Sequence, residues 1–364
     1  MPSGRLRHRG LIRIGEERPF PDPHPGVARR GPRDNPPVLF LSRRDVEELL
    51  DLDRLIEVLS SAMVDLSAGR ASLPPRVAAE VPEESGLLAV MPAHLPSAGS
   101  VGAKLVSVFP HNDARGIPSH QALIAVFDEH TGTPLALMDG THITAARTAA
   151  GSALATRLLA RADASVLAIL GTGVQARSHA RVIPRVMASL HEVRVAGRTT
   201  GKAESLAEEL RGQGLPARSV ASFQQAQTGA DVICAATHSS EPVVRGAWLS
   251  PGSHVNSVGF NVAGREVDPD VVAGAIVVVE ARSSALADPP AGAPDLSPLV
   301  REGRLDPGQV AEVGEIVAGT RPGRTSPEQI TLYRSVGVAV QDVAAAALVL
   351  DAAREHGGGT EVEM

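Results

Sequence analysis

The sequence predicts an α/β fold in which a parallel sheet follows a portion that mixes helices with antiparallel strands. Five short apolar runs recur in the middle of the chain, with helix-like segments between most of them, which indicates a doubly wound parallel sheet. Before them, alternating apolar residues form strand candidates joined by a hairpin-like turn, which indicates an α+β portion. The runs expected in the parallel sheet are residues 166–170, 193–197, 231–237, 254–259 and 275–280.

Composition excludes several classes of protein. The chain of 364 residues is long enough for two domains, and its formal charge of −6 leaves no basic face for nucleic acid. Cys234 is the only cysteine, which excludes an intramolecular disulfide and a cysteine-rich metal site. Because charged residues interrupt the longest apolar runs, no segment is predicted to span a membrane. We therefore expect a globular, cytoplasmic protein without nucleic-acid or membrane partners.

The first 37 residues differ from the rest of the chain. Arginines precede the first acidic residue, Glu16, and six prolines between Pro19 and Pro36 would interrupt any helix. The segment also lacks the apolar stretch of a secretory signal. We therefore expect residues 1–37 to form a disordered extension.

The elements of the first portion follow in order. Residues 38–41 read as a short strand, and Ser42 with Asp45 forms a candidate capping box. Apolar residues at helical spacing predict a helix over 53–68, and Gly69 is placed to end it. Strands are then expected over 87–91, 102–109, 121–127 and 133–138, with residues 129–132 as the turn of a hairpin.

The connection between the portions and the end of the chain carry helical signals. An alanine-rich helix over 144–160 links the first portion to the parallel sheet. After a proline-rich stretch, Ser326 and Pro327 would start a helix, whereas Ile330 alternates with its neighbours like a strand, so the residues leave this segment open. A final helix is predicted over 336–354.

A glycine-rich turn follows the first run of the parallel sheet. The segment from Gly171 to Ala176 has the pattern G-x-G-x-x-A between a buried strand and an amphipathic helix. Gly171 permits the tight turn, Gly173 lets the backbone approach a pyrophosphate, and Ala176 keeps the helix close to the sheet. The N–H groups at the start of the helix then face the phosphates. This order of elements predicts a Rossmann dinucleotide-binding domain.

Three basic residues are candidates for binding a substrate anion. Strand alternation places Lys104 on the same face as Val106, so its ammonium group lies either at the rim of the sheet or toward a ligand cavity. Arg147 is expected in the first turn of the alanine-rich helix, where the helix dipole disfavours a cation by roughly 0.3–1 kcal/mol unless an anion binds there. An ordinary surface position is the alternative for Arg147. Arg76, after two prolines, is a loop residue without further signal.

Motifs for metal or nucleophilic chemistry are absent from the sequence. The histidines at 120, 142, 179, 238 and 254 show neither H-x-x-x-H nor H-E-x-x-H spacing, and no G-x-S-x-G nucleophile elbow occurs. We therefore expect no metal site, and we expect the chemistry to come from a bound cofactor.

Four blocks of sequence stand in a characteristic order. They are Gly102–Pro110, Thr144–Ala150, Gly171–Ala176, and Gly323–Ser326 with Ser335–Asp342 behind it. Together they resemble the ornithine cyclodeaminase/mu-crystallin family, and the resemblance extends from about residue 38 to 354. It implies a homodimer in which residues 38–145 and 325–364 form a discontinuous domain for substrate binding and dimerisation, around a Rossmann domain at 146–324. It also implies that the open segment around Ile330 returns as a strand.

The resemblance assigns site residues position by position. Arg76 and Lys104 match the family's substrate-binding arginine and lysine, and Arg147 matches the arginine between the substrate carboxylate and the cofactor phosphate. Lys104 would also exchange a proton with the imine or amine nitrogen. The residues expected to bind substrate are Arg76, Met91, Lys104, Arg147 and Asn261, with Lys104 as the catalytic residue. Those expected to bind the cofactor are Arg147, Thr148, Gly171, Thr172, Gly173, Val174, Gln175, Ala176, Arg198, Thr199 and Thr237.

Two positions depart from the pattern of the ornithine cyclodeaminases. The family's aspartate for the distal ammonium group corresponds to Asn261, and its glutamate ahead of the Leu-Met-Pro block corresponds to Ala89. A cationic side chain would lack both counter-ions, at a cost of roughly 2–5 kcal/mol if buried. Ornithine is thus disfavoured as a substrate. A neutral or cyclic amino or imino acid is expected, as in the family's alanine dehydrogenase and ketimine reductase branches.

The second strand of the predicted Rossmann domain bears on the choice of cofactor. An acidic residue that binds the ribose 2′-hydroxyl of NAD belongs at the end of this strand, where the chain has Gly197, Arg198 and Thr199. Gly197 removes the repelling carboxylate, and Arg198 with Thr199 would hold a 2′-phosphate. We expect NADP(H) as the preferred cofactor and NAD(H) as the alternative.

The residues and the resemblance together predict an NAD(P)-dependent oxidoreductase that acts at the C–N bond of a small amino or cyclic imino acid. One alternative is a redox-neutral amino-acid cyclodeaminase, in which the cofactor takes a hydride and returns it after ammonia leaves. The other alternative is a non-catalytic, NADP-dependent binder of small molecules.

Overall fold

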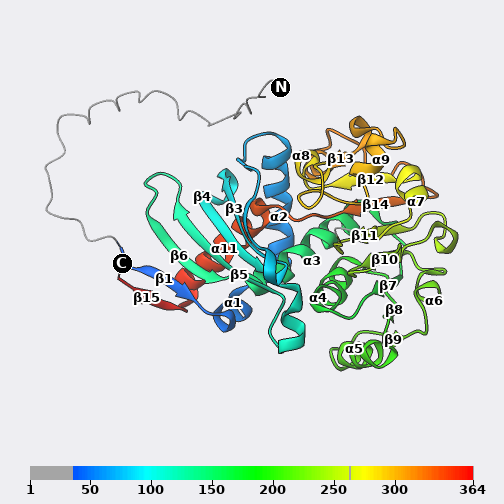
Figure 1. Cartoon of the computed structure of the whole chain (residues 1–364), viewed down its shortest axis with the longest axis horizontal. Coiled ribbons are helices and arrows are strands. Elements are labelled where there is room, and N and C mark those ends of the chain that lie inside the picture. The colour runs from blue at the N-terminus through cyan, green and yellow to red at the C-terminus, as the bar shows by residue number, and fades with distance from the viewer. Residues whose placement is uncertain (1–35, 262–263, 364) are drawn as a thin grey trace, which may run out of the picture. The chain divides into compact units, whose positions relative to one another are not determined.

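Two β-sheets form the framework of the described chain (Figure 1). The computed structural model describes residues 36–261 and 264–363, so the predicted extension of residues 1–37 lies outside the description except for its last two residues. One sheet has seven strands in the order β15-β1-β6-β5-β4-β3-β2, and the other has eight in the order β13-β12-β14-β11-β10-β7-β8-β9. The predicted fold class, a doubly wound parallel sheet joined to an α+β portion, is confirmed.

The seven-stranded sheet is antiparallel except where β1 runs parallel to β6. All the strands predicted in this portion are present, because one face of each is buried and their apolar residues therefore alternate. The strands β2 and β15 were not predicted, since every residue in them is exposed and no alternation marks them. The strands are β1 (Val38–Leu41), β2 (Val77–Val81), β3 (Gly86–Leu95), β4 (Ser100–Val108), β5 (His120–Asp128), β6 (Pro134–Asp139) and β15 (Thr360–Val362).

The eight-stranded sheet is parallel at every strand pairing of the described residues. Its five predicted strands are present, whereas β9 and β13 are too short to give a pattern. The strands are β7 (Val166–Leu170), β8 (Glu192–Ala196), β9 (Ala217–Ser219), β10 (Val232–Ala235), β11 (His254–Ser257), β12 (Ile276–Val279), β13 (Ala311–Glu312) and β14 (Thr331–Arg334).

Strand β14 corrects the predicted domain boundary. The open segment after Ile330 does return as a strand, but β14 pairs with β11 and β12 in the parallel sheet. The predicted grouping of residues 325–364 with the first portion is therefore wrong for this strand. Its side chains Leu332 and Tyr333 are buried there, so packing within the parallel sheet determines its place. The chain rejoins the first portion only at α11.

Helices α3 and α11 lie against the buried face of the seven-stranded sheet, and α2 packs on both helices. The capping box of Ser42 and Asp45 is confirmed at α1, and Gly69, with φ of +70°, follows the end of α2 as predicted. In the described part of the chain, no helix has the length and apolar character needed to cross a membrane. The helices are α1 (Arg43–Leu49), α2 (Leu52–Ser67), α3 (Gly140–Leu159), α4 (Val174–Val182), α5 (Thr200–Gly212), α6 (Phe223–Gln227), α7 (Pro269–Gly274), α8 (Arg282–Ala285), α9 (Ser297–Arg301), α10 (Val313–Val317) and α11 (Ala339–His356).

Helix α3 begins earlier than residue 144, where the sequence predicted its start. Asp139 caps it, because its carboxylate accepts a hydrogen bond of 2.7 Å from the N–H group of His142. Gly140 can open the helix here, since a Cβ at this position would lie 3.0 Å from Ala122. Arg147 is therefore beyond the first turn, and the prediction that the helix dipole disfavours its charge is wrong.

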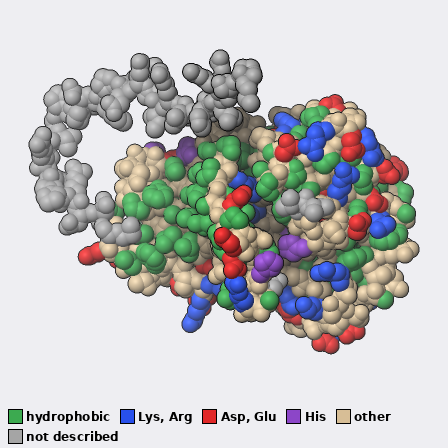
Figure 2. All heavy atoms as spheres, in the orientation of Figure 1, with side chains coloured by type: hydrophobic (Ala, Val, Ile, Leu, Met, Phe, Trp, Pro, Cys, Tyr) green, Lys and Arg blue, Asp and Glu red, His purple; other side chains and the backbone are tan. Residues whose placement is uncertain are grey.

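The apolar side chains of the two sheets form three buried clusters and one exposed surface. One cluster fills the space between the seven-stranded sheet and its helices, and two others cover the two faces of the parallel sheet. The outer face of the seven-stranded sheet, by contrast, exposes apolar side chains over neighbouring strands (green in Figure 2). Those more than a third exposed include Phe40, Leu88, Val101 and Leu123, the last at 50%. We refer to these four residues and the sheet surface around them as the outer face.

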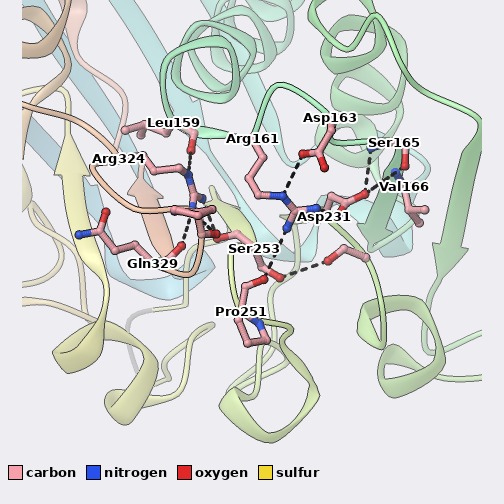
Figure 3. A network of polar contacts seen from close by, with 12 residues as sticks. Leu159, Arg161, Asp163, Ser165, Val166, Asp231, Pro251, Ser253, Arg324 and Gln329 are labelled. Atoms are coloured by element: carbon pink, nitrogen blue, oxygen red, sulfur yellow. Dashed lines mark hydrogen bonds and ion pairs between the residues drawn. The ribbon is translucent and has the colours of Figure 1, made fainter.

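An ionic network closes the amino ends of the parallel strands (Figure 3). Asp231 accepts a hydrogen bond of 3.0 Å from Val166 N at the start of β7, and it pairs with Arg161 at 2.6 Å. Arg324 donates to the carbonyl groups of Leu159, at 2.7 Å, and Ser253, at 3.3 Å. These contacts join the end of α3 to the starts of β7 and β11. The carboxyl ends of the strands, where ligands bind in such sheets, lie at the opposite edge.

Candidate active site

Three elements bring a buried lysine and a buried arginine to one carboxylate. Lys104 of β4 places Nζ 2.8 Å from Oδ2 of Asp342 in α11, and Arg147 of α3 places Nε 2.9 Å from Oδ1 of the same side chain. The exposed fractions of Lys104, Arg147 and Asp342 are 2%, 5% and 0%. Gln341, next to Asp342, accepts a hydrogen bond of 3.1 Å from Arg147. Two alternatives are therefore wrong: that Lys104 lies at the rim of the sheet, and that Arg147 lies at the protein surface.

A glycine explains why the lysine and the carboxylate meet. Gly102 lies on the same face of β4 as Lys104, and a Cβ at Gly102 would lie 2.9 Å from Val343 Cγ2 and 3.0 Å from Ala125 O. A side chain at this position would therefore push α11 away from the sheet. Because Val343 directly follows Asp342, the close approach of α11 brings the carboxylate to the ammonium group.

A second glycine contacts both arginines of the site. Arg76, half-buried in the loop before β2, donates a hydrogen bond of 3.1 Å to the carbonyl of Gly337. Gly337 has φ of +69°, and a Cβ there would lie 2.7 Å from Nη1 of Arg147. The buried carboxylate of Glu280 fixes this turn by accepting a hydrogen bond of 3.2 Å from Gly337 N. Arg76 and Arg147 thus both lie against the backbone turn at Gly337.

Burial is the largest single influence on the pKa values of Lys104, Asp342 and Arg76. It lowers the pKa of Lys104 from 10.5 to about 8, opposed by Asp342 and assisted by Arg147 and Arg76. Although burial alone would raise the pKa of Asp342, Arg147 and Lys104 hold it below its usual value. Burial, with repulsion from Arg147, also lowers the pKa of Arg76. Lys104 therefore carries its charge at neutral pH and loses it near pH 8.

Apolar side chains share the face of the first sheet that carries Lys104. Met91 lies opposite Lys104 in the pairing of β3 with β4 and is 7% exposed. Ala89, two residues before Met91, lies on the same face and is buried. Asn261 lies outside both sheets, in the segment after β11, and donates a hydrogen bond of 3.1 Å to the carbonyl of His238. Met91 and Ala89 thus offer no charge to a ligand beside Lys104.

The glycine-rich turn has the geometry expected for a dinucleotide. Gly171 has φ of +121°, and a Cβ there would lie 2.5 Å from Ala236 O, so only glycine fits. A Cβ at Gly173, the residue before α4, would meet no atom within 4 Å, which leaves its backbone open to a ligand. Val174 is 67% exposed, and Ala176 is fully buried against the sheet. The residues of this turn therefore fit a pyrophosphate at the start of α4.

The end of β8 presents a basic side chain beside this turn. A Cβ at Gly197 would lie 2.8 Å from Thr172 Cγ2, so the glycine keeps the two loops together. Arg198 and Thr199 follow it and are both exposed. Within the described residues, no hydrogen bond or ion pair engages the Arg198 side chain.

The other predicted cofactor residues frame the turn. Thr148 donates from its hydroxyl group to Thr144 O at 2.7 Å, within α3. Gln175 has a buried side-chain oxygen without a hydrogen-bond donor among the described residues. Thr237 donates from its backbone and hydroxyl groups to Glu266, at 2.7 and 2.8 Å. The same carboxylate therefore orients the loop after β10.

Helix α3 links the cation cluster to the glycine-rich turn. It carries Arg147 and packs against α4, where Ser152 and His179 form a buried hydrogen bond of 2.9 Å. Burial lowers the pKa of His179 to about 4, so the ring is neutral and holds the helices together without a charge. Figure 2 shows the surface hollowed along the boundary between the two sheets, with histidine side chains beside the hollow. His120 of β5 and His238 after β10 stack across this boundary, with ring centroids 6.4 Å apart.

The sequence prediction missed the acceptors of the site, Asp342, Gln341 and Glu280. One signal was available: Gln341 and Asp342 are the only polar side chains in the segment 336–350, which is otherwise made of valine, alanine, leucine and glycine. A carboxylate in such a segment must be paired when it is buried. The sequence does not show which cation pairs with it, because Lys104 and Arg147 are far away along the chain.

Residues 38–357 match the family model described as the ornithine cyclodeaminase/mu-crystallin family. Ketimine reductase mu-crystallin of Mus musculus is 38% identical over 317 residues, which cover 86% of this chain and 96% of the mouse protein.

Two solved structures resemble this chain over nearly their full lengths. Thermococcus litoralis Delta(1)-pyrroline-2-carboxylate reductase in complex with NADH and L-proline has a TM-score of 0.84 and 38% identity, and the match covers 89% of this chain and 100% of that one. An archaeal alanine dehydrogenase dimer with bound NAD has a TM-score of 0.83 and 31% identity, covering 90% of this chain and 99% of that one.

Proposed function

The chain belongs to the ornithine cyclodeaminase/mu-crystallin family, and we propose that it transfers hydride between a nicotinamide cofactor and the C–N carbon of a small imino or amino acid. A ketimine reductase, a pyrroline-2-carboxylate reductase and an alanine dehydrogenase are among its relatives, and two of these are solved with NADH or NAD. The proposed substrate is a cyclic imino acid with one carboxylate and a neutral ring, such as pyrroline- or piperideine-2-carboxylate.

The charge balance of the site carries this proposal. Its cations are Arg76, Lys104 and Arg147, and the carboxylates that act on them are Asp342 and Glu280. Three positive and two negative charges leave one positive charge, which a single substrate carboxylate would neutralise. Because Lys104 and Arg147 are almost fully buried, water screens this charge weakly, and an anion bound there is strongly favoured.

The residues of the chain then supply binding, orientation and a proton. A bound nicotinamide provides or accepts the hydride at the substrate carbon. Arg76 and Arg147 fix the carboxylate, so the carbon next to it has one orientation. Lys104, protonated at neutral pH, gives a proton to the imine nitrogen during reduction and takes one from the amine in the reverse direction.

The cofactor is proposed to be NADP(H) in preference to NAD(H). The strand end at Gly197 carries no carboxylate that would repel a 2′-phosphate, and the exposed Arg198 offers a guanidinium group for it. Thr199 adds a hydroxyl group beside Arg198. Since a nicotinamide cofactor is available inside cells, the cytoplasm is the proposed compartment.

The functional unit is proposed to be a homodimer that pairs through the outer face of the seven-stranded sheet. This face exposes apolar side chains on several neighbouring strands, and a surface of this kind indicates a protein contact. A dimer would cover it, and the archaeal alanine dehydrogenase is described as a dimer.

A substrate screen with both cofactors tests the proposal. Piperideine-2-carboxylate, pyrroline-2-carboxylate, pyruvate with ammonia, and ornithine are each mixed with enzyme and cofactor, and absorbance at 340 nm and ammonia are both recorded. Oxidation of NADPH with a cyclic imino acid is the expected result. Ammonia released from ornithine without a net change in absorbance would instead establish a cyclodeaminase. Ligand binding without either signal would establish a carrier.

A further inference from the structure

A single carboxylate serves both of the deeply buried cations of the site. Asp342 gives Oδ1 to Arg147 and Oδ2 to Lys104, at 2.9 and 2.8 Å. We propose that Asp342 is a positioning residue, an inference that rests on the proposed function. Asp342 aims the Lys104 ammonium group at the substrate nitrogen, and it keeps the proton on Lys104 until the substrate takes it. Asp342 thus acts through Lys104, the residue that its Oδ2 contacts.

Arg147 has more contacts that hold it in place than Lys104 has. Arg147 has a second acceptor, the side-chain oxygen of Gln341, and packs against Gly337. Lys104 has no hydrogen-bond or ion-pair partner other than Asp342 among the described residues. Likewise, the ammonium group is the only polar contact of Oδ2 there. Loss of the Asp342 charge therefore leaves Arg147 anchored and Lys104 without an anchor.

The surroundings of Lys104 would drive off its proton if Asp342 were neutral. The charged groups facing it are Asp342 from α11, Arg147 from α3 and Arg76 from the loop before β2. Glu280, after β12, acts on Arg76, and Glu280 and Arg147 both act on Tyr333 of β14. Burial and two positive neighbours all disfavour the ammonium form, and Asp342 alone opposes them. The carboxylate therefore determines whether Lys104 is an acid at neutral pH.

Composition supports a role that requires a transferable proton. Of the 35 basic residues of the chain, only Lys104 and Lys202 are lysines. An arginine at position 104 would keep its charge under all physiological conditions and could not serve as an acid. A lysine whose proton is released near neutral pH needs a partner that prevents its early loss, and Asp342 has that position.

The small number of lysines allows a direct measurement. The full-length protein with bound cofactor is labelled with ¹³Cε-lysine, so that NMR shows one signal for Lys104 and one for Lys202, assigned with Lys104→Met. We expect the Lys104 signal to titrate near pH 8 in the unmodified protein and at least about one pH unit lower in Asp342→Asn. This readout needs no substrate, so it separates a failure of the Asp342 proposal from a failure of the proposed function.

Activity measurements complete the test. In Asp342→Asn, the alkaline limb of kcat/KM for the cyclic imino acid should move to lower pH with the NMR titration, and kcat should fall at least about tenfold. Asp342→Glu keeps the charge but displaces it, so kcat should fall while the Lys104 titration stays within about half a pH unit of the unmodified protein. If Asp342→Asn does not fold, Asp342→Glu still tests the proposal through its kcat and its Lys104 titration.

The matched control is Asp231→Asn, which removes a carboxylate that pairs with Arg161 at the opposite edge of the parallel sheet (Figure 3). It should lower stability and leave the Lys104 titration unchanged. An unchanged Lys104 titration in Asp342→Asn would overturn the proposal and reduce Asp342 to a tie between α11 and α3. A shift of one unit or more in Asp342→Glu would overturn it as well.

Discussion

Replacing Lys104 by methionine tests whether its ammonium group serves the reaction at the expense of stability. Methionine fills a similar volume without a charge, at a position that is 2% exposed. Burial lowers the pKa of Lys104 from 10.5 to about 8, so the unfolded chain binds this proton more tightly than the folded protein does. The resulting destabilisation is fully present below pH 8 and is lost as the pH rises toward 10.5. It is equivalent to about 3 kcal/mol at pH 7 and roughly 1 kcal/mol at pH 10.

Urea denaturation of both proteins at the two pH values measures this effect. Between pH 7 and pH 10, the free energy of unfolding of the unmodified protein should rise by about 2 kcal/mol relative to Lys104→Met. In the same preparations, kcat/KM of Lys104→Met should be lower by at least about a hundredfold, as expected when one positioned charge is removed from an active site.

Lys202→Met is the control, because Lys202 is exposed on α5 and is the only other lysine. It should match the unmodified protein in stability at both pH values and in activity. Near-native turnover by Lys104→Met would refute the catalytic role of Lys104. A difference in unfolding free energy that does not change with pH would refute the claim that its charge is held at a cost.

Three further predictions concern the cofactor, the substrate and the assembly. Arg198→Ala should weaken NADPH binding at least about tenfold and change NADH binding less than about twofold in fluorescence titrations; tighter binding of NADH than NADPH by the unmodified protein would contradict this. Asn261→Asp should raise activity toward ornithine relative to the cyclic imino acid about tenfold, because it supplies a counter-ion for the distal ammonium group. Efficient formation of proline and ammonia from ornithine by the unmodified protein would contradict this prediction. Leu123→Arg, on the outer face, should turn a dimer into a monomer in light-scattering measurements, whereas Ile117→Arg, at an exposed loop position, should not; an unmodified protein that is monomeric would rule out the proposed contact.

Local patterns predict most of the fold, because burial and backbone geometry act on neighbouring residues. The antiparallel strands β4 and β5 alternate between a buried and an exposed face, and their sequences alternate accordingly. The capping box of Ser42 and Asp45 involves residues three positions apart. Gly171 is required by the turn in which it lies, since its φ of +121° and the nearby Ala236 carbonyl exclude other residues. Each of these features can be found without knowing the rest of the structure.

The predictions that were wrong or incomplete depend on contacts between distant parts of the chain. The strand β14 has too few residues to show which sheet it joins, and its partners β11 and β12 determine that. The start of α3 depends on Asp139, whose capping role is hidden because the residue also ends a strand. For Lys104, alternation correctly gives the face of the strand, yet it cannot distinguish a rim from a buried site. That distinction depends on Asp342, which α11 delivers from the far end of the chain.

The choice of lysine at position 104 follows from the chemistry of its surroundings. A cation is needed there to balance the substrate carboxylate, and in this chain the basic residue is otherwise almost always arginine. Arginine would meet the requirement for charge and would form two hydrogen bonds with a carboxylate, as Arg147 can. What arginine cannot do is give up a proton near neutral pH, whereas burial brings the pKa of Lys104 to about 8. The lysine at this position is therefore better explained by proton transfer than by anion binding alone, and the paired carboxylate of Asp342 by the need to keep that proton until an imine nitrogen takes it.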